Sequence, residues 1–230
     1  MKFRQLLGMK GPANRDQRSK LLLISIVLFF VLPAISENHE VGRVCLVLIL
    51  YITLVAAILE LAEKRIVFWS AIPLAGASMV FLAVSHYFPT PGLLIANALA
   101  LATFLSLVSI SLFVYLGENS QITSGRIYVS VSVYFLMGLA WFSIYNLLNI
   151  LQPGSFMEGG VPLPPTAPWS TILYFSLTTL TTVGYGDIVA VKPAARMFAM
   201  LEATAGVLYV AITVARLVAA RQTSKNPDGV

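Results

Sequence analysis

One run of seven residues, Thr181 to Asp187 with the sequence TTVGYGD, has the residue types and spacing to bind a cation through its backbone. A pore that strips water from an ion must replace the water oxygens with protein oxygens. Gly184 and Gly186 can adopt left-handed backbone conformations that a Cβ atom disfavours, so neighbouring carbonyl groups can point the same way. Thr182 can add its hydroxyl as the innermost ligand. Such rings of oxygen suit a hard monovalent cation.

A Gly-Tyr-Gly sequence alone would be an ordinary turn, and the surroundings of this one distinguish the two interpretations. It lies between a short apolar stretch, 169–181, and a long one, 194–219, with a threonine pair before it and Asp187 after it. In this context the run resembles the selectivity filter of potassium channels. The resemblance covers roughly residues 126–219, and Leu201 to Tyr209 are similar to the inner helix of bacterial members of that family.

The resemblance implies a potassium-selective filter that needs no cofactor, with K⁺ as the permeant ion. The filter residues would be Thr182, Val183, Gly184, Tyr185 and Gly186, with K⁺ bound at the first four. The side chains of Val183 and Tyr185 would point away from the ion path and pack the filter walls. Because one chain carries one such motif, the resemblance also implies a homotetramer, four chains in a closed ring.

The stretch 169–181 is too short to span a membrane and is expected to be a re-entrant pore helix. Its carboxyl end carries partial negative charge, which favours a cation below the filter. Tyr174 precedes Asp187 by thirteen residues, the family spacing for a bond that braces the outer filter, and simple apolar packing explains Tyr174 equally well. Thr181 and Thr178 are further expected supports, and some family members carry Glu at the position of Thr178.

Glu202 is a carboxylate within an otherwise apolar stretch. Carboxylates inside a membrane normally face protein and have partners, so we expect Glu202 to support the filter from behind. Either it accepts hydrogen bonds or it stays protonated and donates one. The expected partners are Thr178, Thr179 and Tyr185.

Gly206 occupies the position where the family has a hinge glycine in the inner helix. A close contact between helices explains a glycine there equally well, because small residues let membrane helices approach. Val207, Val210 and Val214 follow at a spacing that puts them on one helical face. We expect these three valines to line the cavity or a hydrophobic constriction.

The composition of the chain determines where these elements must lie. Of its 230 residues, 58% are apolar and 11% are charged, against roughly 25% charged in soluble domains. A chain of this kind cannot make a polar shell, which excludes a soluble enzyme, a secreted disulfide scaffold and a nucleic-acid-binding protein. The sequence also contains no metal-binding, nucleophilic or acid–base constellation, so we expect no enzyme activity.

Six apolar runs are long enough to cross a membrane as helices. They cover about 20–36, 42–60, 66–87, 92–116, 126–151 and 194–219. The expected fold is therefore an all-α membrane protein with six transmembrane helices and a pore helix and filter loop between the fifth and sixth. The first run, with its basic start, also has features of a cleavable signal peptide.

The basic residues predict the orientation. Twelve of the 15 Lys and Arg residues fall on one side when the N-terminus is inside, so both termini are expected to be cytoplasmic in a cell membrane. The expected divisions are a basic N-terminus at 1–20, a four-helix membrane domain at 21–124, a pore domain at 125–220 and a short tail at 221–230. The N-terminus could bind anionic lipid, and its charges are equally explained as topological signals.

The fourth apolar run, 92–116, contains no charged residue and cannot carry gating charge. The sequence therefore predicts passive conduction of K⁺ that is not steeply voltage-gated. The alternative is a non-enzymatic regulatory or structural subunit of a hetero-oligomeric cation channel.

Overall fold

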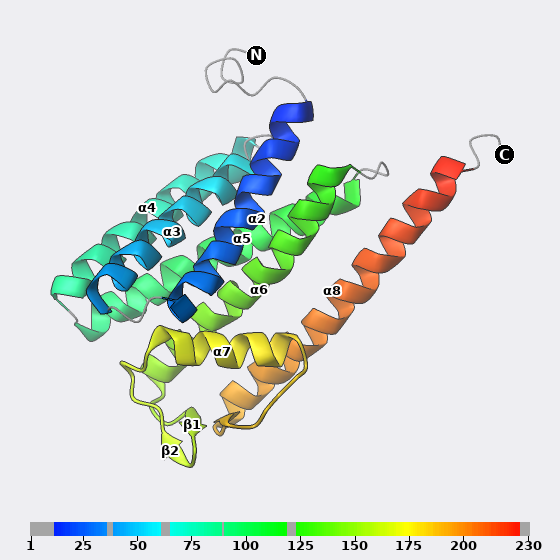
Figure 1. Ribbon diagram of the computed structural model, residues 1–230. Coiled ribbons are helices and arrows are strands. Elements are labelled where there is room, and N and C mark those ends of the chain that lie inside the picture. Colours follow the sequence, from blue (N-terminus) through cyan, green and yellow to red (C-terminus); the bar gives the residue numbers. More distant parts are fainter. Residues whose placement is uncertain (1–11, 36–38, 61–64, 89, 119–122, 226–230) are drawn as a thin grey trace. The chain divides into compact units, whose positions relative to one another are not determined.

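The computed structural model describes residues 12–35, 39–60, 65–88, 90–118 and 123–225, and most of them are helical (Figure 1). The elements in chain order are α2 (Pro12–Ile35), α3 (His39–Glu60), α4 (Arg65–Tyr87), α5 (Pro91–Glu118), α6 (Ser124–Leu151), β1 (Phe156–Glu158), β2 (Val161–Pro162), α7 (Trp169–Leu180), β3 (Ile188–Ala190) and α8 (Pro193–Lys225). Parts of the predicted N-terminus and of the predicted tail, 1–11 and 226–230, lie outside the described residues.

Four of the described helices are long and apolar enough to cross a membrane, which makes the chain a helical membrane protein. The candidate spans are Ile66–Val84 in α4, Pro91–Gly117 in α5, Ser124–Leu151 in α6 and Pro193–Arg216 in α8. They correspond to the last four apolar runs of the sequence. In α3 the described apolar part is shorter, Leu48–Glu60, and the prediction of six spans therefore remains a prediction. The twelve residues of α7 are too few to span.

The described chain forms two compact units. The first comprises the described parts of 1–72, 108–135 and 217–230, and the second comprises those of 73–107 and 136–216. In the first unit α2 packs along α3. The expected boundary at residue 124 is not tested by this division and remains a prediction.

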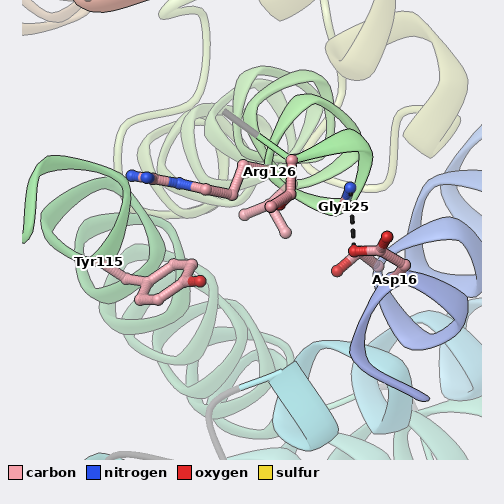
Figure 2. Close-up of a pocket in the computed structure, with 7 residues that line it drawn as sticks. Asp16, Tyr115, Gly125 and Arg126 are labelled. Atoms are coloured by element: carbon pink, nitrogen blue, oxygen red, sulfur yellow. Dashed lines mark hydrogen bonds between the residues drawn. The ribbon is translucent and has the colours of Figure 1, made fainter. Parts of the chain in front are cut away.

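Within the first unit, a small pocket lies where α2, the end of α5 and the start of α6 meet (Figure 2). The Asp16 carboxylate accepts a hydrogen bond of 3.1 Å from the backbone N–H of Gly125, which places a negative charge at the positive end of α6. A Cβ atom at Gly125 would overlap Asp16, so only glycine permits this approach. The Arg126 guanidinium donates to the carbonyl oxygen of Leu116 and lies 5.9 Å from the centre of the Tyr115 ring.

The core of the second unit is an aromatic cluster that joins α6, β1 and α7. The rings of Tyr145, Phe156 and Phe175 meet edge to face, with centroids 5.1 to 5.4 Å apart. Such arrangements stabilise aromatic pairs by about 0.5–1.5 kcal/mol beyond the burial of their area. The cluster holds one face of α7 against α6 and against β1.

A three-stranded antiparallel sheet lies in the segment 152–190, in the strand order β2-β1-β3. Gly159 and Gly160, both with positive φ, form the two-residue turn between β1 and β2, as type I′ hairpins require. Pairing of β1 with β3 joins the hairpin to the residues directly after Asp187. The fold is predominantly helical, as expected, and the small sheet adds to it: residues 152–168, with five prolines and three glycines, include a hairpin that pairs with the residues after Asp187.

Candidate functional site

The backbone of the run from Thr182 to Gly186 has positive φ at every second residue. The φ angles are 59° at Thr182, 53° at Gly184 and 80° at Gly186, and Val183 and Tyr185 between them do not share this conformation. Left-handed and right-handed residues in alternation turn successive carbonyl groups toward the same side of the chain. A β-branched residue at positive φ is a strained outlier, so the surrounding contacts must hold Thr182 in place.

Those contacts come from the last turn of α7. The backbone N–H groups of Val183 and Gly184 both donate to the carbonyl oxygen of Thr178, at 2.9 and 3.1 Å, and the N–H of Thr182 donates to Thr179 at 2.9 Å. Thr178 therefore supports the loop through its carbonyl group. The N–H and the hydroxyl of Thr181 both donate to Leu177, at 3.0 and 2.7 Å. The inner end of the loop is thus fastened to the negative end of the α7 dipole.

The C-terminal end of the loop is held by Asp187. Its Oδ1 atom accepts a 3.0 Å hydrogen bond from the N–H of Ile188, and its carboxylate accepts one from the Tyr174 hydroxyl. The Tyr174 ring also stacks on the Tyr185 ring, with centroids 6.3 Å apart and planes 2° apart. From the hairpin, the N–H of Gly159 donates to the Asp187 carbonyl oxygen at 3.3 Å. Tyr174 and Asp187 are the pair whose spacing suggested a brace.

Two side chains of the loop that were expected to pack filter walls are exposed within one chain. Val183 is 52% exposed and Tyr185 is 72% exposed, although both were expected to pack. Val207, Val210 and Val214 on α8 are also exposed, like other large residues of this helix, and their place along a cavity remains a prediction.

Glu202 is completely buried between three elements, with partners that differ from those expected. Its Oε2 atom accepts a 2.5 Å hydrogen bond from the Tyr145 hydroxyl of α6, and its Oε1 atom lies 2.6 Å from the Ser176 hydroxyl of α7. Thr178, Thr179 and Tyr185 do not fill these places. Ser176 could have been found from its spacing, because Ile172, Phe175 and Ser176 share the buried face of α7. Nothing in the local sequence pattern indicated Tyr145.

Gly206 is packed against the carboxyl end of α7. A Cβ atom there would overlap the carbonyl oxygen of Leu180, the last residue of α7. Of the two explanations for this glycine, the geometry favours the close contact. Near the carboxyl end of α6, the buried Asn149 donates a 2.7 Å hydrogen bond to the carbonyl oxygen of Pro164 and so anchors the loop before α7.

A comparison with known protein families matches the segment that contains this loop. Residues 163–222 match the protein family described as "Ion channel". A stretch of 84 residues, 36% of this chain, is 34% identical to the two pore potassium channel c of Oryza sativa subsp. japonica. The match covers 18% of that relative, so the chain spans about a fifth of its length. No solved structure is significantly similar. These findings support a potassium channel family for the matched segment, and a membrane ion channel.

Proposed function

We propose that the chain forms a potassium-selective channel that conducts K⁺ passively through a ring of backbone carbonyl oxygens. The observation that carries this proposal is the positive φ at Thr182, Gly184 and Gly186, in a loop fastened to the carboxyl end of α7. In potassium channels, carbonyl oxygens of four TVGYG loops replace the hydration shell of the ion. Several adjacent sites of this kind let an ion enter favourably and leave by repulsion from the next.

The conducting form is a homotetramer. One chain contributes one filter strand, and a ring needs several around an axis. The exposed side chains of Val183 and Tyr185 supply the surface that neighbouring copies would cover. The match to the ion channel family supports oligomeric assembly in a lipid environment, and four copies are our proposal.

The proposed setting is a cell membrane crossed six times, with both termini in the cytoplasm. The four apolar helices α4, α5, α6 and α8 supply the last four crossings. The excess of Lys and Arg on one side of these spans supports the orientation.

The test of this function is ion flux through the purified full chain in liposomes. With K⁺ and Na⁺ on opposite sides, we expect the reversal potential to follow the K⁺ gradient. A reversal potential that does not change when K⁺ replaces Na⁺ would contradict potassium selectivity. Folded protein that conducts only together with another channel subunit would favour the hetero-oligomeric alternative.

We also expect channel opening to depend weakly on voltage. The α5 span, Pro91–Gly117, has no charged residue, whereas sensor helices move about 3–4 charges per subunit through the field. Gating charge is measured from the limiting slope of open probability at low opening. A slope equivalent to several charges per subunit would show that a charge elsewhere in the chain senses the field.

A further inference from the structure

A chain of three short contacts between oxygen atoms runs behind the pore helix, through the second compact unit. The Tyr145 hydroxyl lies 2.5 Å from Glu202 Oε2, and the other carboxyl oxygen, Oε1, lies 2.6 Å from Ser176 Oγ. Ser176 Oγ in turn lies 2.8 Å from the carbonyl oxygen of Gly138 on α6. Both Glu202 and Ser176 are inaccessible to solvent, so no exposed water satisfies these atoms.

The number of protons available to these contacts determines whether the carboxyl group of Glu202 is protonated or ionised. Each of the three contacts needs one proton between its oxygens, because two acceptors at such distances repel each other. The hydroxyls of Tyr145 and Ser176 supply one proton each, and the Gly138 carbonyl can only accept. An ionised Glu202 also only accepts, which leaves one contact without a proton. A neutral Glu202 supplies the third proton and completes the chain.

We propose that Glu202 is a neutral carboxylic acid that donates to Ser176, and that Ser176 and Tyr145 are positioning residues for the filter. In this arrangement Tyr145 donates to Oε2, the acid proton goes to Ser176, and Ser176 donates to Gly138. The acid then clamps the middle of α7 between α6 and α8. Ser176 lies two residues before Thr178, whose carbonyl oxygen holds two filter amides, so the clamp sets the position of that carbonyl.

The surroundings of Glu202 make loss of its proton unfavourable for the clamp. From α6 the titratable group facing it is Tyr145, and from α7 the facing polar group is Ser176, which does not titrate. On α8 itself, Arg196 is exposed and donates to the carbonyl oxygen of Ala190, while Tyr209 lies two turns further on. Neither hydrogen-bond partner of Glu202 is a cation. An ionised carboxylate would therefore be an uncompensated buried charge beside a contact that lacks its proton.

The direct test measures the carbonyl stretching band of a protonated carboxylic acid by infrared spectroscopy, on the full chain in liposomes at neutral pH. We expect the band to disappear in Glu202→Gln. The matched control is Glu60→Gln, which removes another buried carboxyl group, on α3, and should leave the Glu202 band in place. A band that is unchanged by Glu202→Gln would mean that Glu202 is ionised and would overturn the proposal.

A second variant keeps the test decisive if Glu202→Gln does not fold. Tyr145→Phe removes the hydroxyl group that donates to Oε2 and keeps the aromatic ring. Because a hydrogen bond to a carbonyl oxygen lowers its stretching frequency, the acid band should move to higher frequency. A band that stays in place in folded Tyr145→Phe would also overturn the proposal.

The functional arm rests on the proposed channel function and measures potassium flux against pH. Wild-type flux should fall on the alkaline side by about tenfold or more per pH unit once the carboxyl group titrates, because the neutral form is the one that clamps and each of the four copies carries one such group. Glu202→Gln keeps a donor toward Ser176 and an acceptor toward Tyr145, so it should conduct at neutral pH and lack the alkaline loss. An alkaline loss that persists in Glu202→Gln would contradict the role of the acid.

The two arms separate the two proposals. A wild-type band that depends on Glu202 without any potassium flux would contradict the channel function and leave the neutral acid standing. Potassium-selective flux without that band would contradict the neutral acid and leave the channel function standing.

Discussion

Replacing Gly184 with Ala is expected to abolish potassium-selective flux. Gly184 has a φ of 53°, and an added Cβ atom would meet no atom of the chain within 4 Å. The effect must therefore come from the backbone, where a left-handed conformation costs a residue with a Cβ roughly 1–2 kcal/mol. Four filter strands would each bear this cost. The strand would relax toward negative φ and turn a carbonyl oxygen away from the ion path.

The measurement is the reversal potential of the variant in liposomes with mixed K⁺ and Na⁺. A matched control is Gly159→Ala in the hairpin turn, which has a φ of 56° and equally open surroundings. Both variants carry the same type of strain, so Gly159→Ala should lose some stability and keep its selectivity. If Gly184→Ala is as selective for K⁺ as the wild type, the alignment of the carbonyl groups is not the source of potassium selectivity.

Replacing Gly206 with Ala is expected to destabilise the pore helix and the assembled channel. The added Cβ atom would overlap the Leu180 carbonyl oxygen, a backbone atom at the end of α7 that no rotamer change can move. Overpacking of this kind costs about 1–3 kcal/mol per site, and each copy in a ring would contribute. We expect a clear fall in the melting temperature of the oligomer and in potassium flux.

Two further glycine substitutions serve as controls for the loss of stability expected in Gly206→Ala. At Gly138 an added Cβ atom would lie 2.8 Å from Leu177 Cδ2, the end of a flexible side chain, so Gly138→Ala should cost less. At Gly76 on α4 it would meet nothing within 4 Å, and Gly76→Ala should melt like the wild type. A Gly206→Ala variant with wild-type melting and reduced opening would instead support the hinge explanation.

Much of this molecule follows from local sequence. The predicted apolar stretch 169–181 corresponds to α7, Trp169–Leu180, and the fifth run, 126–151, corresponds to α6, Ser124–Leu151. These boundaries are readable because backbone groups at membrane depth must bond within their own segment, so that apolar length and helix length coincide. The alternation of glycine with large residues also indicated the left-handed positions Gly184 and Gly186.

Only the tertiary structure shows which residues these elements contact. Glu202 bonds to residues 26 and 57 positions away, and β3 pairs with a hairpin that precedes the pore helix. Hydropathy and spacing indicate that a buried carboxyl group needs partners, and they do not indicate which of the serines, threonines and tyrosines will be in reach. That choice depends on how α6, α7 and α8 are rotated about their axes, and side-chain packing among distant segments determines that rotation.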